Sequence, residues 1–220
     1  MASATVEDYL KHIYLAGTPS GSGQVPMGRL AEALDVTPGT VTTMVKSLAA
    51  NRLVLYEPYR GVTLTRRGRR LAASMVRRHR LVELFLVEVL GMDWAEVHED
   101  AERLEHAISD RLLARLDDYL GHPVTDPHGD PIPDRHGAIE RKQRHTLMDC
   151  APGARVQLER IVDQRPEFLR SLDRHGLRPG RRLRIVERDD VAGTILVRAQ
   201  RKPALSLGQT AARRILVRGA

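Results

Sequence analysis

The chain has 220 residues, of which 42% are hydrophobic, and it carries a formal net charge of +7 and a single cysteine. This length accommodates one or two domains, or three small ones, and the lone Cys150 excludes a disulfide framework and a CxxC zinc site. No apolar run approaches the roughly 20 residues of a membrane span, and the N-terminus lacks a signal peptide's basic start, so we expect a cytoplasmic protein without a membrane partner.

The chain begins with a pattern of short helices. Apolar residues at helical spacing predict a helix over residues 5–16 and a second, shorter helix over 27–34. Thr37 can cap the next helix, and Pro38 then occupies its favoured first position. Apolar residues continue at helical spacing as far as about Asn51, where we expect this third helix to end.

Two short β-forming runs, 53–56 and 62–65, follow these helices and predict a hairpin. Helix, short helix, turn, helix and hairpin together predict a winged helix-turn-helix DNA-binding domain over residues 1–70. Its third helix begins with small, hydroxyl-bearing residues that allow close approach to DNA but offer no bidentate base reading, so we expect backbone contacts and DNA shape to dominate. The candidate DNA contacts are Thr37, Pro38, Gly39, Thr40, Thr42, Thr43, Lys46 and Arg60.

A helical region follows over residues 71–140. We expect a long helix over 65–90 and a second over 94–120, opened by a capping box of Asp93 and Glu96. The apolar faces of the two helices can bury each other or a partner subunit. The region is interpreted as a dimerisation and metal-binding domain.

Turn-forming residues then dominate 121–150, which we interpret as a connecting segment with the linker proper at 141–152. Residues 153–220 carry short β-forming runs separated by Gly, Pro and Asp, with one helix near 165–176. This pattern predicts a small β-barrel as the last domain.

Two groups of potential metal ligands lie at helical spacing in the middle of the chain. Four residues spaced i, i+4, i+7, i+8 share one helix face, and His79 and Glu83 form an i, i+4 pair on the preceding helix. Imidazole and carboxylate in register suit a divalent transition metal, whereas the alternative is an ordinary solvated helix face. The four residues are His98, Glu102, Glu105 and His106.

Charge is distributed unevenly along the chain. Residues 1–80 carry 12 Lys and Arg against 5 Asp and Glu, residues 81–150 carry 7 against 16, and residues 151–220 carry 16 against 7. A basic first third suits DNA phosphates and an acidic middle suits a cation. The basic last third either touches DNA or complements the acidic middle.

Several motifs resemble the diphtheria-toxin-repressor family of metal-dependent bacterial transcription regulators, and the resemblance covers essentially the whole chain. It implies that the last domain is SH3-like, as in the longer members of that family. The motifs are Glu7-Asp-Tyr-Leu10, Tyr59-Arg-Gly-Val-Thr-Leu-Thr65, Arg78-His-Arg-Leu81, Val97–His106 and Asp126-Pro-His-Gly-Asp-Pro-Ile-Pro133.

The resemblance also implies two metal sites in each subunit. The primary site would combine a ligand on the first helix with three on the dimerisation helix, namely Asp8, Glu102, Glu105 and His106. The ancillary site would combine three ligands of the helical domain with two of the last domain, namely His79, Glu83, His98, Gln164 and Glu167.

This chain departs at three positions from one or the other branch of the family. The iron-sensing members place Met and Cys where this chain has Asp8 and Glu102, and hard oxygen ligands favour Mn²⁺. The manganese-sensing members place a second carboxylate where this chain has Lys11, which argues against a closely spaced binuclear cluster.

We therefore expect a Mn²⁺-dependent repressor of manganese-homeostasis genes that acts as a homodimer on a palindromic operator, with one or two dimers on each operator. An Fe²⁺-dependent repressor of iron uptake is the alternative. Two remoter readings are a metal-dependent hydrolase and a DNA-binding regulator with a purely structural metal.

Overall fold

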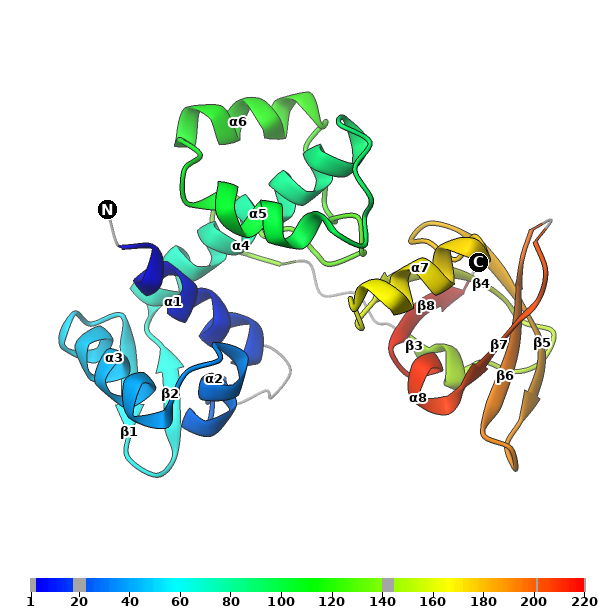
Figure 1. Ribbon diagram of the computed structural model, residues 1–220, viewed down its shortest axis with the longest axis horizontal. Helices are drawn as coiled ribbons and strands as arrows, with labels where there is room; N and C mark the ends of the chain where they lie inside the picture. Colours follow the sequence, from blue (N-terminus) through cyan, green and yellow to red (C-terminus); the bar gives the residue numbers. More distant parts are fainter. Residues whose placement is uncertain (1–2, 18–22, 140–144, 201, 220) are drawn as a thin grey trace. The chain divides into compact units, whose positions relative to one another are not determined.

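The computed structural model describes residues 3–17, 23–139, 145–200 and 202–219 (Figure 1). The chain divides into two compact units, with bounds Met1–His79 plus Pro133–Ile139 and Arg80–Ile132 plus Glu140–Ala220. None of the helices in the described ranges has both the length and the apolar content needed to cross a bilayer.

Three helices build the first unit, as the sequence predicts: α1 (Ala4–Gly17), α2 (Met27–Ala33) and α3 (Pro38–Ala50). Thr37 caps α3, since its hydroxyl oxygen accepts a hydrogen bond from the backbone N–H of Thr40 at 3.2 Å. The helix start is therefore determined locally, by a capping side chain followed by proline.

Strands β1 (Val54–Glu57) and β2 (Gly61–Leu64) pair antiparallel and complete the predicted winged helix-turn-helix (Figure 1). Gly68 holds the hairpin close to the following helix, because a Cβ there would lie 1.9 Å from the carbonyl oxygen of Leu53. The core of this unit is formed by apolar residues of all five elements, among them Leu10, Ile13, Leu30, Val41, Val45, Leu48, Val54 and Val62.

The long helix α4 (Arg66–Glu88) begins where expected, with the Thr65 hydroxyl accepting from the N–H of Gly68 at 3.1 Å. The single helix predicted over 94–120 is wrong: the segment forms α5 (Val97–Glu105) and α6 (Asp110–Tyr119). Ser109 makes the break, because its hydroxyl oxygen accepts from the N–H of Leu112 and caps a new helix.

The predicted capping box at Asp93 does not open α5. The Asp93 carboxylate accepts from the N–H of Ala95 and closes a turn, and α5 begins only at Val97. Trp94 and Ala95 in this turn are buried and join the core of the last module.

The last module is a six-stranded antiparallel sheet with the order β3-β8-β4-β5-β6-β7. Among the described residues no pairing joins β3 to β7, so the SH3-like module is open in its hydrogen bonding rather than a closed barrel. Its helix α7 (Pro166–Arg174) lies where the sequence predicts one. The other elements are β3 (His145–Thr146), η1 (Leu147–Asp149), β4 (Arg155–Ile161), β5 (Arg182–Asp189), β6 (Thr194–Ala199), β7 (Leu205–Gly208), α8 (Gln209–Ala212) and β8 (Ile215–Gly219).

Candidate functional site

The N-terminal turns of α3 present an exposed face of small side chains. Thr37, Pro38, Gly39, Thr40 and Thr43 are exposed and Thr42 is half-buried. The hydroxyls of Thr42 and Thr43 donate to carbonyls one turn earlier, at 2.8 and 3.1 Å. Since these donors are already engaged within the helix, the face suits close approach to a phosphate backbone better than donation to base edges.

The first unit also carries two exposed cations that are candidate DNA contacts. Lys46 is exposed on α3, and Arg60 lies in the loop between β1 and β2. Arg60 forms an ion pair with Glu57 at 3.1 Å, with 75% of the arginine side chain exposed. An ion pair this exposed is worth well under about 1 kcal/mol, so Arg60 can exchange Glu57 for a phosphate.

The predicted stripe on α5 differs in burial from residue to residue. Glu105 is fully buried, Glu102 and His106 are half-buried and His98 is exposed. The ring Nε2 of His106 lies 3.6 Å from the Glu105 carboxylate. A fully buried glutamate beside an imidazole differs from a solvated helix face and fits a cation site. Asp8, which the sequence analysis assigns to the same site, is half-buried on α1.

The second predicted pair, His79 and Glu83, lies buried on successive turns of α4. The buried ammonium of Lys11 lies 3.3 Å from the His79 Nδ1. Lysine can only donate, so Nδ1 accepts and a neutral ring carries its proton on Nε2. His79 can therefore ligate a metal only if the Lys11 contact is released or the Nε2 proton is lost.

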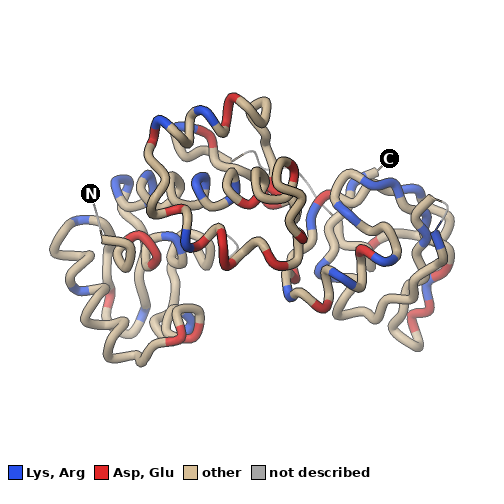
Figure 2. The backbone as a smooth tube through the Cα atoms, turned by 45° about the horizontal axis from the view of Figure 1, so that its top comes forward, with Lys and Arg blue, Asp and Glu red and all other residues tan. Residues whose placement is uncertain are grey.

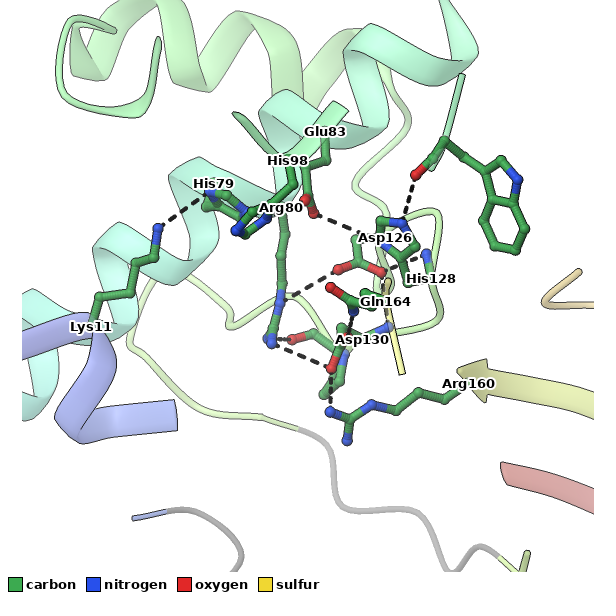
Figure 3. Close-up of polar contacts among 12 residues, drawn as sticks. Lys11, His79, Arg80, Glu83, His98, Asp126, His128, Asp130, Arg160 and Gln164 are labelled. Carbon is green, nitrogen blue, oxygen red and sulfur yellow. Dashed lines mark hydrogen bonds and ion pairs between the residues drawn. The ribbon is translucent and has the colours of Figure 1, made fainter. Parts of the chain in front are cut away.

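Glu83 is also part of a buried group that the sequence analysis missed (Figure 3). One ligand atom each from Glu83, Asp126 and His128 lies within 4.8 Å of the other two, and all three residues are buried. His98 contacts Glu83 from α5, with its Nδ1 3.2 Å from the carboxylate. The Asp-Pro-His-Gly sequence carried the signal, but its turn-forming residues led us to interpret it as a connecting segment.

With a neutral ring, His128 leaves the lone pair of its Nδ1 directed at this group. Its Nε2 lies 2.8 Å from the carbonyl oxygen of Trp94, which can only accept, so Nε2 carries the proton. Its Nδ1 is buried, has no hydrogen-bond partner among the residues that the structure describes, and lies 4.0 Å from the Glu83 carboxylate. The Trp94 ring stacks on the imidazole with centroids 5.6 Å apart and fixes its plane. An orphaned, oriented imidazole nitrogen beside two carboxylates fits a divalent metal.

A network of charges surrounds the same turn (Figure 3). Arg80 lies 3.6 Å from the Asp126 carboxylate and donates to Asp130 at 3.4 Å, and Arg160 also pairs with Asp130. Burial, with Asp130 and Glu83 nearby, raises the pKa of the Asp126 carboxyl well above its usual value, and Arg80 opposes the rise.

Backbone geometry holds this turn in place. Asp126 accepts from the N–H groups of His128 and Asp130, both at 2.9 Å. Gly129 adopts a φ of +84°, and a Cβ there would lie 1.8 Å from the Glu159 carbonyl oxygen on β4. Only glycine meets both conditions, so the turn is fixed against the last module.

The two ligands expected from the last module differ in their surroundings. Gln164 is half-buried, and its side-chain amide donates to Asp130 at 2.6 Å, so it borders the charge network. Glu167 is exposed in the first turn of α7. The adjacent Asp163 is buried instead, and hydrogen bonds from Arg165 and Arg214 lower its pKa to about 2.

Three family models match the chain in succession. Residues 1–62 match the N-terminal DNA-binding domain of iron-dependent repressors, residues 65–134 match their metal-binding and dimerisation domain, and residues 145–219 match the FeoA domain. The three matched segments follow the same order as the modules predicted from the sequence.

Individual relatives agree with these matches. An uncharacterised helix-turn-helix-type transcriptional regulator from Methanocaldococcus jannaschii is 40% identical over 118 residues, which are 54% of this chain and 94% of that protein. Among solved structures, a manganese-dependent transcriptional repressor in complex with manganese is 41% identical, with a TM-score of 0.86 over 98% of this chain and 100% of that one. ScaR with bound Cd²⁺ is 34% identical, with a TM-score of 0.79 over 98% and 99%.

Proposed function

This chain belongs to the iron-dependent-repressor family of transcription regulators, and from that premise we propose that it represses transcription in response to Mn²⁺. The observation that carries the metal assignment is the donor set of the primary site, which holds three carboxylates, one imidazole and no sulfur. Similarity over nearly the whole chain to a manganese-dependent repressor supports it. The family consists of regulators rather than enzymes, so the hydrolase alternative has no support.

The primary site is formed by Asp8, Glu102, Glu105 and His106. Mn²⁺ binds weakly in the divalent series and is selected by hard oxygen ligands and tolerant geometry. An Fe²⁺ regulator would gain from a softer ligand, which neither Asp8 nor Glu102 supplies. The fully buried Glu105 supports the assignment, because it offers a cation a carboxylate ligand shielded from water.

The ligands couple metal to DNA because they come from two modules. Asp8 belongs to the DNA-binding module, and the other three lie on or at the end of α5. Bound metal supplies positive charge that these carboxylates share. Without that charge, Asp8 and the two glutamates repel one another and favour separation of the modules. Ligation by all four selects the arrangement of recognition helices that fits DNA.

The second site is formed around Glu83. We expect Asp126 and His128 to ligate with it, because the His128 Nδ1 lone pair is already directed at the carboxylates. His98 contacts Glu83 and joins the same set, whereas His79 joins when the Lys11 contact is released or its Nε2 proton is lost. Gln164 borders the site through Asp130, and the exposed Glu167 would have to approach from outside it.

The regulator acts on operator DNA as a homodimer. Leu104, Leu112 and Tyr119 are exposed on the helical region, with 41%, 49% and 72% of their surface accessible, and such apolar residues suit burial by a second subunit. A twofold dimer presents two recognition helices, so the operator is a near-palindrome that one dimer or a pair of dimers occupies. Repression of this kind takes place where the chromosome lies, in the cytoplasm of a bacterial or archaeal cell.

A gel-shift titration tests the proposed function. We expect the chain to bind a palindromic operator in Mn²⁺ and to lose at least about tenfold in affinity in chelator, within the usual range of coupling between two ligands. Equal operator binding in Mn²⁺ and in chelator would refute the proposal that the protein responds to metal. Activation by Fe²⁺ at lower concentrations than by Mn²⁺, measured anaerobically, would favour the iron-responsive alternative, and a metal that survives mild chelation would indicate a structural site.

Replacement of Arg60 tests whether the loop between β1 and β2, the wing of the DNA-binding module, contacts DNA. We expect Arg60→Ala to weaken binding by a similar factor on every sequence and to lower the salt slope by about 0.9 per subunit, as one lost phosphate contact does. Arg174→Ala, which removes an exposed arginine of α7, is the matched control. A loss confined to certain operator bases would identify Arg60 as a base-reading residue instead.

A further inference from the structure

Arginine side chains lie side by side across three strands of the last module. In the strand register Arg155 on β4 is directly opposite Arg184 on β5, and Arg184 is directly opposite Arg198 on β6. Arg182 lies two residues before Arg184, on the same face of the sheet. We call these four residues the arginine row.

The row faces solvent and is not neutralised. All four arginines are exposed, while their neighbours Leu183, Ile185 and Val197 point inward and are buried. None of the four forms an ion pair with any carboxylate in the described part of the chain, whereas most other arginines of this module do. Figure 2 shows the Lys and Arg segments along the strands of this module.

Directly opposed like charges destabilise a sheet, since the side chains of cross-strand neighbours lie about 5 Å apart. Two consecutive Arg–Arg pairs therefore cost stability in the isolated protein. The row borders a shallow hollow of about 530 Å³, lined also by Gln200. An anion held there would offset the repulsion and accept several guanidinium hydrogen bonds at once.

We propose that the arginine row binds the phosphate backbone of double-stranded DNA, in addition to the contact made by the winged helix-turn-helix. The proposal rests on DNA binding by the same chain, but not on the identity of the metal. Each guanidinium group can donate two hydrogen bonds to one phosphate. A contact with the DNA backbone that does not depend on sequence requires only such positive charges. DNA held by the first module also raises the local concentration of phosphate for the second contact.

The composition of the face distinguishes duplex DNA from other polyanions. Strands β4, β5 and β6 contain no aromatic residue, so the face has no stacking platform for single-stranded nucleic acid. The interface with a protein partner usually has an apolar centre. Leu183 and Ala199, which line the hollow, are buried beneath the row and do not offer one. The face is thus mainly electrostatic, with the partly exposed Val186 as an apolar neighbour on β5.

The test compares two variants of the full chain that remove the same charge. Arg184→Gln with Arg198→Gln removes the centre of the row, and Arg174→Gln with Arg213→Gln removes two exposed arginines outside it. Affinity for a duplex that extends beyond the operator is measured against salt in saturating Mn²⁺. We expect the row variant to lower the salt slope by about 1.8 per subunit, at about 0.9 for each lost contact, and the control to leave it nearly unchanged.

Each outcome bears on the proposal. Equal slopes for the row variant and the control would overturn it, and an accompanying loss of binding to a polyglutamate peptide would point to an acidic protein partner instead. If the wild type fails to bind DNA, the proposed function itself fails. Arg184→Lys with Arg198→Lys keeps the charge and should restore the slope. Thermal melting should show no loss of stability in the Gln variant.

Discussion

Glu105→Gln should abolish operator binding at Mn²⁺ concentrations that saturate the wild-type protein. Glu105 is fully buried beside His106, and the change removes one negative charge with little change in volume. Loss of a residue that only orients a ligand costs 10- to 100-fold in metal affinity, so loss of a ligand should raise the required Mn²⁺ by about 100-fold or more. Binding by fluorescence anisotropy across a Mn²⁺ titration measures the shift.

Glu99→Gln is the matched control, because Glu99 is exposed on the same helix and its replacement removes the same charge. It should leave the Mn²⁺ dependence within about twofold of the wild type, since only the nearby electrostatic field changes. If Glu105→Gln retains wild-type Mn²⁺ dependence while its thermal melting is normal, Glu105 is not a ligand. The primary site would then lie elsewhere.

The winged helix-turn-helix could be predicted because its signals are local. The capping by Thr37, the first-turn proline and the hairpin all depend on residues a few positions apart, and the elements begin and end within two residues of the prediction. The break at Ser109 is also a local signal, but the apolar periodicity that continues across it predicted one helix instead of two. Periodicity reports which face is apolar and not whether the helix is continuous.

The residues of the candidate sites likewise divide into those that local sequence could predict and those that it could not. The spacing of His98, Glu102 and Glu105 places them on one helix face, and this depends only on helical geometry. Asp126 and His128 could not be placed from sequence, because their Asp-Pro-His-Gly segment forms a turn whether it is solvated or buried. Their burial comes from contacts with Trp94 and β4, which are distant in the chain.

Arg80→Met should lower the free energy of unfolding by about 3–5 kcal/mol, the usual cost of leaving a buried carboxylate without its cation. Arg80 and Asp126 are both buried, and their charged groups lie 3.6 Å apart. Arg160 and Gln164 still contact Asp130 in the variant, so the loss is concentrated on Asp126. Chemical denaturation in chelator measures this without a contribution from bound metal.

A double-variant comparison separates the stability lost with the ion pair from the stability lost with packing. Asp126→Asn keeps acceptor capacity for the N–H groups of His128 and Asp130 but removes the charge that Arg80 neutralises. In the double variant with Arg80→Met, much of the stability should return, so the two changes together cost less than their sum. Arg70→Met, at an exposed position of the same helix, should change stability by less than about 0.5 kcal/mol. Strict additivity of Arg80→Met and Asp126→Asn would mean that Arg80 stabilises this turn through its hydrogen bond to Pro131 and its packed methylenes, and that its charge has no part in it.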